Sequence, residues 1–237
     1  MFRTLLAALL LPAVAVAAPV PKAAGCKKLS ETFGEQVNPD STCKYEPAGK
    51  DGLRIVVPTT HPIEEVDHGK TVRPHMTRKV EGDFVLTVRI QHTYKPEAGK
   101  AEAAKQKTMV AAGIGFIDAD DARNTFSVCH MNTKSGDKWT TSQLMQIMHR
   151  GGGSGSGSGG QPAADKPTYL QVIRQGEEIK SAFSSDGKKW QRFSAMKMNT
   201  LGSAVNIGPV ACQSTDAEYS VEFTEYEIKP LTEEPKK

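Results

Sequence analysis

Three glutamates near the end of the chain are the side chains best suited to catalysis. Glu222, Glu225 and Glu227 lie within the segment YSVEFTEYEI at 219–228. Glycoside hydrolysis needs two carboxyl groups about 5–10 Å apart, one acting as an acid and the other as a nucleophile or base. The alternating pattern predicts a strand, in which Glu222 points away from the other two glutamates. We therefore interpret all three as solvated strand positions, and we predict no catalytic residue and no hydrolase activity.

A second acidic group, Asp118, Asp120 and Asp121, follows an apolar run. Calcium prefers clustered carboxylate and carbonyl oxygens, so these residues are a candidate calcium site. No glycine-spaced ligand loop accompanies them, and an ordinary acidic β-turn explains the same composition. We expect no cofactor, with calcium as the alternative.

Histidines offer a possible zinc site. His61, His68 and His75 recur every seven residues, and neutral imidazoles bind zinc. Prolines and a glycine between them break any helix that would stack the rings, so we expect loop histidines and no metal. Cys129 and His130 are neighbours on a predicted strand and point to opposite faces, which gives no site either.

The remaining chemistry is that of a binding surface. Sugars are held by aromatic rings and planar hydrogen-bonding side chains, because each sugar ring has an apolar face and a hydroxyl edge. Arg89 stands out because its guanidinium can make a bidentate contact. Scattered surface polarity and core packing are the alternative explanation for any one residue. The candidate ligand-binding residues are Arg89, Gln91, His75, His130, Trp139, Tyr169 and Arg174.

The first residues predict export. Arg3, the apolar stretch at 5–16 and the A-V-A site at 15–17 match a secretory signal peptide covering residues 1–17. We expect a secreted or periplasmic protein of the bacterial cell envelope without a membrane span, because no second hydrophobic segment follows. The formal net charge of the 237 residues is +3, and no basic block is interleaved with aromatics, so no nucleic-acid partner is expected. The oligomeric state stays open.

The chain has four cysteines, Cys26, Cys43, Cys129 and Cys212. An even count in an exported chain favours disulfides, and no pair has the C-x-x-C spacing of zinc or redox sites. Four cysteines allow three pairings. We expect Cys26–Cys43 as a local bridge and Cys129–Cys212 as a bridge between strands, with buried thiols as the alternative for the second pair.

Period-two alternation dominates the chain and helical periodicity is scarce, which predicts an all-β sandwich. A hairpin between 144–150 and 169–174 is one possible pairing. Strands are predicted at 52–57, 84–91, 110–117, 124–131, 169–174, 205–213 and 219–228.

Turns and loops separate these strands. The segment SSDG at 184–187 predicts a tight turn, because Asp-Gly suits a positive φ. The insertion at 96–107 is interpreted as a polar loop or a short helix. The Gly/Ser run at 151–160 is interpreted as a flexible loop inside a single domain at 28–230, and residues 231–237 as a disordered tail.

Several motifs, in their order along the chain, carry a resemblance to a known family. They are RKVEGDF at 78–84, AGIGF at 112–116, R-x-G at 174–176 followed by SSDGKKW at 184–190, and VEF at 221–223. The chain resembles the bacterial concanavalin A-like (laminin G-like) domains of unknown function related to the C-terminal β-sandwich of family 43 glycosidases (β-xylosidases). The resemblance implies a jelly-roll sandwich of two antiparallel sheets. It also implies that carbohydrate could bind on the concave sheet or its loops.

Three functions remain open. The first is an exported, non-catalytic β-sandwich that binds carbohydrate or another cell-envelope component. The second is a carbohydrate-active hydrolase, and the third is a structural or protein-interaction domain. The fold hosts all three classes and does not choose among them.

Overall fold

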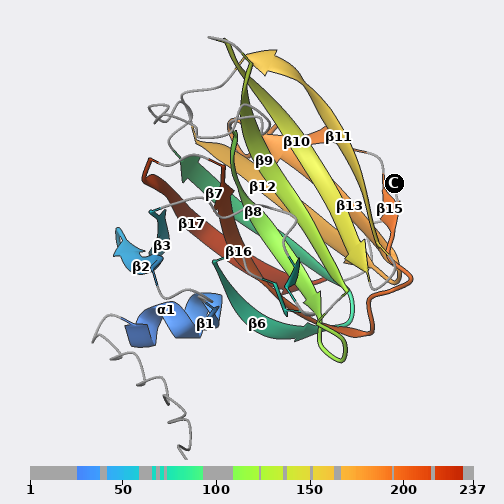
Figure 1. Cartoon of the computed structure of the whole chain (residues 1–237). Helices are drawn as coiled ribbons and strands as arrows, with labels where there is room; N and C mark the ends of the chain where they lie inside the picture. Colours follow the sequence, from blue (N-terminus) through green and yellow to red (C-terminus); the bar gives the residue numbers. More distant parts are fainter. Residues whose placement is uncertain are drawn as a thin grey trace, which may run out of the picture.

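The protein is a sandwich of two antiparallel sheets (Figure 1), as the sequence predicts. The computed structural model describes residues 26–37, 42–58, 66–67, 70–71, 74–92, 109–122, 124–135, 138–149, 152–162, 167–193, 195–214 and 217–231. The predicted signal peptide, the insertion at 96–107, His61, His68 and most of the predicted C-terminal tail lie outside these residues.

The first sheet has seven described strands, and β8 is at its centre. In Figure 1, its strands β8 to β11 pass in front of the second sheet. The order is β1 (Glu35–Val37), β6 (His75–Glu81), β16 (Ala204–Gln213), β8 (Met109–Asp118), β9 (Thr125–Ser135), β10 (Lys138–His149) and β11 (Gly152–Pro162).

The second sheet has eight described strands, and β7 is central. A further pair, β4 (Val66–Asp67) and β5 (Lys70–Thr71), stands apart from both sheets. The order is β14 (Gln191–Arg192), β13 (Glu178–Ser184), β12 (Thr168–Gln175), β7 (Phe84–His92), β17 (Tyr219–Pro230), β3 (Gly52–Val57) and β2 (Lys44–Ala48), with β15 (Met196–Lys197) also paired to β13.

Strand β7 shows how alternation builds the core. Phe84, Leu86, Val88 and Ile90 are almost fully buried between the sheets, as a period of two requires. The intervening residues face outward and are half-buried or exposed. The inner faces of the other long strands meet them in one hydrophobic core.

One short helix, α1 (Cys26–Phe33), covers the edge of the sandwich near β2, β3 and β6. Leu29 and Phe33, four residues apart, are buried in the core, and the Phe33 ring lies 4.9 Å from that of Tyr226. The helix ends at Gly34, whose φ of +90° favours glycine. A Cβ there would lie 2.0 Å from the carbonyl oxygen of Thr77, so the close approach also requires glycine.

The Gly/Ser run is a strand and not the predicted flexible loop. Its residues form β11, which pairs antiparallel with β10 from Thr140↔Pro162 to His149↔Gly152. Glycine and serine have little strand preference of their own, so the pairing with β10 imposes the extended conformation. The predicted hairpin between 144–150 and 169–174 is also wrong, because β12 pairs with β7 and β13 in the other sheet.

The structure supports neither predicted disulfide. Cys43, Cys129 and Cys212 are buried thiols. Cys129 pairs in register with Gly113 and Cys212 with Ala111, so the two cysteines flank β8 from opposite sides. Two strand spacings amount to about 10 Å, beyond the Cα separation that a disulfide spans. The side chain of Cys26 is outside the described part of the chain.

The predicted turn at 184–187 is confirmed. Gly187 has a φ of +71°. Asp186 Oδ1 accepts hydrogen bonds from the backbone N–H groups of Lys189 and Lys188, both at 2.8 Å. These two bonds, together with one donated by the Ser184 hydroxyl, lower the pKa of Asp186 to about 2. The turn carries the chain from β13 to β14.

Candidate functional site

The outer face of the eight-stranded sheet gathers three of the seven candidate residues, Arg89, Gln91 and Tyr169. Arg89 of β7 is directly opposite Tyr169 of β12, and Thr87 is opposite Gln171 in the next outward row. Directly opposite residues of an antiparallel pair have Cβ atoms about 5 Å apart, so each row is a contact pair. Two adjacent rows therefore present a guanidinium, a phenol, a hydroxyl and an amide side by side.

A β-bulge in β17 changes which way its glutamates point. The register with β7 shifts between Thr224 and Glu227, and Glu225 has a φ of +51°. Glu222 forms an ion pair with Arg54, and Glu225 with Arg89, both of them outward-facing residues. The extra residue puts Glu222, Glu225 and Glu227 on one face, so the prediction that Glu222 points away from the others is wrong.

Arg89, Tyr169 and Glu225 form a cluster across three neighbouring strands, which we call the Arg89 cluster. Arg89 Nε lies 3.9 Å from Glu225 Oε1, and Tyr169 Oη donates a hydrogen bond to Glu225 Oε2 at 3.1 Å. Partial burial, and then this bond to the carboxylate, raise the pKa of Tyr169. A Cβ at Gly187 would lie 3.4–3.5 Å from the Tyr169 ring, so the predicted turn packs beneath the ring.

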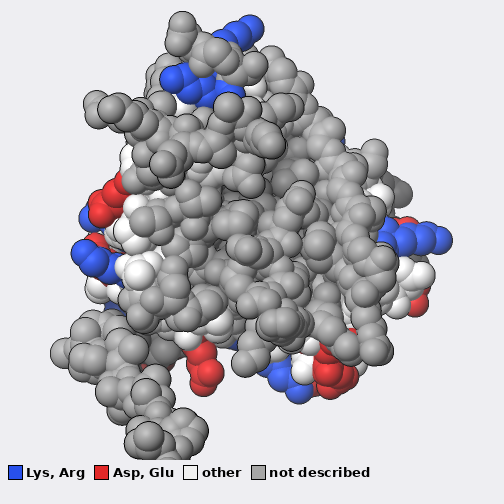
Figure 2. All heavy atoms as spheres, in the orientation of Figure 1, with Lys and Arg blue, Asp and Glu red and all other residues white. Residues whose placement is uncertain are grey.

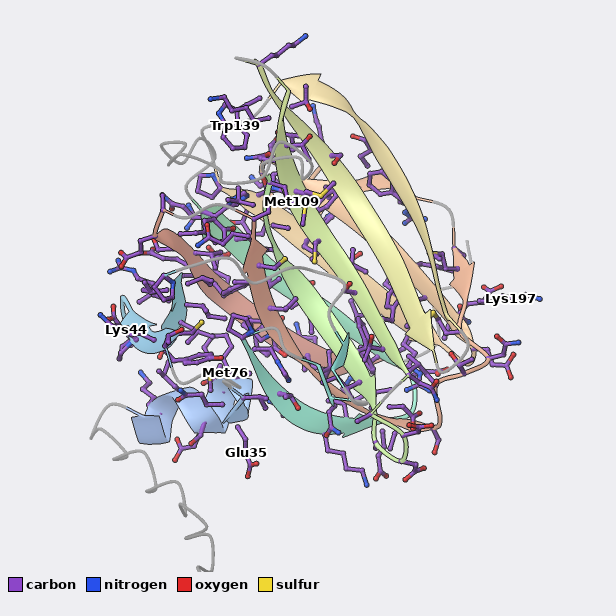
Figure 3. All side chains as sticks on the ribbon, viewed as in Figure 1. Glu35, Lys44, Met76, Met109, Trp139 and Lys197 are labelled. Carbon is purple, nitrogen blue, oxygen red and sulfur yellow. The ribbon has the colours of Figure 1, made fainter. Side chains whose placement is uncertain are left out.

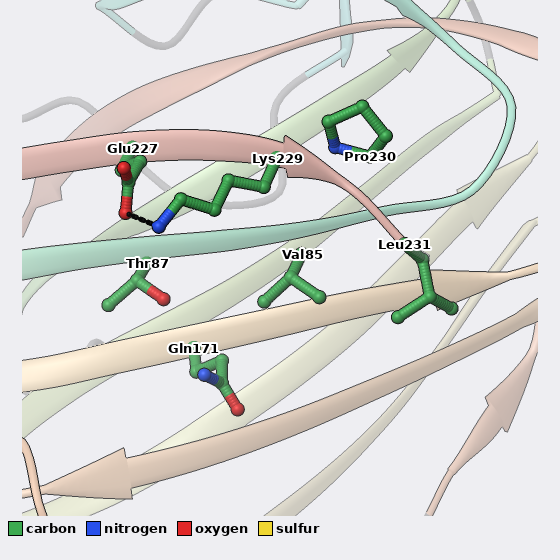
Figure 4. A pocket seen from close by; sticks show the side chains of 7 residues that line it. All are labelled: Val85, Thr87, Gln171, Glu227, Lys229, Pro230 and Leu231. Atoms are coloured by element: carbon green, nitrogen blue, oxygen red, sulfur yellow. Dashed lines mark ion pairs between the residues drawn. The ribbon is translucent and has the colours of Figure 1, made fainter. Parts of the chain in front are cut away.

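A hollow of about 290 Å³ lies beside this cluster (Figure 4). Thr87 and Gln171 supply polar groups from its floor, and Lys229 Nζ pairs with Glu227 Oε2 at 2.8 Å along one side. Apolar side chains complete the wall. The full lining is Val85, Thr87, Gln171, Glu227, Lys229, Pro230 and Leu231.

Gln91 continues the polar face on the other side of Arg89. It pairs in register with Glu222, and Arg54 Nε donates to Glu222 Oε1 at 3.0 Å. Arg54 also lies 4.0 Å from Glu46 at the sheet edge. Arg89, Gln91 and Tyr169 are therefore brought together on one surface.

His130 and His75 are buried elsewhere. His130 of β9 faces the interior, where its Nδ1 lies 3.3 Å from Nε2 of His92. Burial lowers the pKa of His130 to about 4, and burial followed by the proximity of His130 lowers the pKa of His92 well below its usual value. His75 is 5% exposed on β6 and pairs with Val210. The structure brings neither His75 nor His130 to the Arg89 cluster.

Arg174 and Trp139 also lie apart from the cluster. Arg174 faces inward, away from the face that carries Gln171, and is 5% exposed. Its Nη2 donates to the carbonyl oxygen of Gly202, so it ties β12 to the loop before β16. Figure 3 shows Trp139 at the end of the sandwich where β10 begins, in the other sheet.

In the acidic turn after β8, the Asp118 carboxylate accepts hydrogen bonds from backbone N–H groups. Asp118 Oδ1 accepts the backbone N–H groups of Asp120 and Asp121 at 2.9 and 2.8 Å, and Oδ2 accepts that of Gly202 at 2.5 Å. These bonds give the Asp118 carboxylate a role in shaping the turn. Within the described residues, no group of three or more His, Cys, Asp or Glu is arranged to hold a metal ion.

Comparison with solved structures identifies the fold. A functionally unknown protein from Saccharomyces cerevisiae matches with a TM-score of 0.61 and 17% identity, over 86% of this chain and 98% of that one. The GH43 protein BlXynB from Bacillus licheniformis (K247S mutant) matches with a TM-score of 0.53 and 15% identity, over 82% of this chain and 36% of that one. The chain is a concanavalin A-like β-sandwich.

A further solved structure and a family model also match the chain. The alginate lyase from Klebsiella pneumoniae matches with a TM-score of 0.52 and 8% identity, over 78% of this chain and 84% of that one. The family model described as "Protein of unknown function (DUF1349)" matches residues 157–231, which run from β11 to the end of β17. No curated protein matches the chain.

The bulge is the feature of the site that sequence reasoning missed. The run 222–227 (EFTEYE) departs from strict alternation, because Phe223 and Tyr226 both pack inward although they are three residues apart. An odd spacing between inward aromatics is the signal that could have indicated the extra residue.

Proposed function

We propose that the protein is an exported, non-catalytic domain that binds carbohydrate on the outer face of its eight-stranded sheet. The observation that carries this proposal is the pair of polar rows, Arg89–Tyr169 and Thr87–Gln171, bordering a hollow with an apolar wall. A sugar needs such a combination of directional donors, acceptors and apolar surface. The likeness to carbohydrate-active proteins supports the same class.

Figure 2, viewed as Figure 1, shows described acidic and basic side chains together around the rim of the molecule. No described helix is long and apolar enough to cross a bilayer. A cell-envelope glycan is the partner that this proposal names, and export rests on the predicted signal peptide at 1–17.

A glycan array with the chain lacking residues 1–17 tests the proposal. Arg89→Ala and Gln171→Ala should each weaken retention of the best ligand about tenfold or more, because each removes a directional contact to it. Lys79→Ala is the matched control, since Lys79 is exposed on β6 of the other sheet, ion-paired to Glu81. Equal loss in all three variants, or no ligand for the wild type, would contradict the proposal.

A second candidate is a carbohydrate-active enzyme, because the bulge gathers three carboxylates on one face. A general acid of a glycosidase is held protonated by an apolar environment. Glu225 and Glu227, in contrast, are 59% and 58% exposed and ion-paired. Release of reducing sugar or of unsaturated product from a polysaccharide panel, abolished by Glu225→Gln, would establish this candidate in place of simple binding.

A further inference from the structure

A second hollow lies on the same face and shares Gln171 with the first. Its volume is about 310 Å³, and it opens on the β13 side of β12. Because Gln171 lines both hollows, they adjoin across β12, and we call the two together the cross-strand groove. Five strands from β17 to β14 span about 19 Å, room for a short oligosaccharide lying across them. The second hollow is lined by Gln171, Ile173, Lys180, Ser181, Ala182, Arg192, Phe193 and Ala195.

The charges of the two hollows differ. In the first hollow, Lys229 is neutralised by its ion pair with Glu227. Both charged residues that line the second hollow, Lys180 and Arg192, are cations. Lys180 Nζ donates to the neutral amide of Gln175 at 3.0 Å, and neither cation has a carboxylate partner among the described residues. The β13 end of the groove is therefore positively charged.

Apolar side chains lie beside these cations. Ile173 is opposite Lys180, and Ala182 is opposite Arg192 in the β13–β14 pair. The Phe193 ring is held edge-on against Phe183, with ring centroids 5.5 Å apart. An apolar surface next to two cationic donors matches a sugar ring that carries an acidic group.

We propose that the cross-strand groove binds an anionic polysaccharide built from uronic acids. A sugar carboxylate lies between Lys180 and Arg192, while neighbouring sugar rings extend over Gln171 toward Thr87. Arg192 can bind a carboxylate through two N–H groups, and Lys180 adds a point charge. This inference rests on the proposed carbohydrate-binding function and specifies its ligand class.

The test measures affinity for polygalacturonate oligosaccharides and for the same oligosaccharides after reduction of their carboxyl groups. The wild type should bind the acidic form at least tenfold more tightly, and the difference should shrink as salt is raised. The double variant Lys180→Gln/Arg192→Gln should lose most of this preference and keep the affinity for the reduced form. Lys197→Gln controls for the loss of one positive charge elsewhere, because Lys197 on β15 (Figure 3) is exposed and does not line the groove.

The outcomes separate the two proposals. Equal binding of the acidic and reduced forms, or an unchanged preference in the double variant, would refute the uronate inference and leave carbohydrate binding standing. Inorganic polyphosphate competing as well as the uronate oligosaccharide would also refute it, because the groove would then recognise charge alone. Failure of the whole glycan panel to bind would refute both.

Discussion

Arg89 and Tyr169 face each other across β7 and β12, and both reach the carboxylate of Glu225. The Tyr169 hydroxyl thereby orients the Glu225 carboxylate, which is ion-paired with the Arg89 guanidinium. The three groups come from three strands, so the sheet itself sets the orientation of Arg89. An outward arginine held in this way is pre-organised for a ligand, which reduces the entropy cost of binding.

Tyr169→Phe should weaken carbohydrate binding less than Arg89→Ala, by about two- to fivefold, because it removes only the hydroxyl that orients Glu225. The ring, which packs on Gly187, is kept. Calorimetric titration of both single variants and the double variant should show effects that do not add. Unfolding free energies should change by less than about 1 kcal/mol, since the cluster is partly exposed. Additive losses would show that Tyr169 acts independently of Arg89.

The β-bulge in β17 leads to a prediction about Glu225. Glu225→Gly and Glu225→Val both remove the carboxylate, but only glycine tolerates a φ of +51° without strain. Urea unfolding should therefore find the glycine variant more stable than the valine variant by about 1–2 kcal/mol. The reverse order would mean that strand preference outweighs the positive φ at this position.

Two glycines of β8 should respond very differently to alanine. A Cβ at Gly113 would lie 1.9 Å from the backbone oxygen of Val128, whereas a Cβ at Gly115 would meet Val210 at an ordinary 3.7 Å. Gly113→Ala should cost about 2 kcal/mol or more in unfolding free energy, because the β8–β9 pair must separate. Gly115→Ala, the control on the same strand, should change it by less than about 1 kcal/mol. Similar midpoints in thermal melts would contradict the close approach.

Acid should destabilise the fold through His92 and His130. The unfolded chain takes up protons near the ordinary histidine pKa of 6.5, while burial lowers the pKa of His130 to about 4. The unfolding free energy should therefore fall as the pH drops from about 6.5 to about 4. His130 contributes on the order of 3 kcal/mol at full effect, and His92 acts in the same direction.

The variant His130→Gln tests whether His130 causes this loss of stability in acid. Its plot of unfolding free energy against pH should be flatter than that of the wild type between pH 6.5 and 4, whatever its absolute stability. The comparison of slopes is needed because carboxylates titrate in the lower part of the same range. Parallel plots would assign the acid sensitivity to other groups.

The strands and their inward residues could be predicted because alternation reports burial directly, as β7 shows. Alternation also puts Arg89 and Gln91 on one face, but Tyr169 joins them only through the pairing of β12 with β7, which the sequence did not indicate. The pairing of β10 with β11 could not be predicted, since ten residues of glycine and serine carry no hydrophobic pattern. The burial of Arg174 and His130 depends on contacts with the loop at Gly202 and with His92, which are distant in sequence.

The placement of β16 and β17 has a consequence for when the protein can fold. They are the last two described strands, yet β16 lies between β6 and β8, and β17 between β3 and β7. Without β16 and β17, each sheet would consist of two separate groups of strands. The strands on either side of the gap would lack a hydrogen-bonded neighbour. Neither sheet can close until residues 204–230 have emerged from the ribosome, and the many contacts between distant segments make closure slow. The topology thus keeps both sheets of the nascent chain open until β16 and β17 have been synthesised.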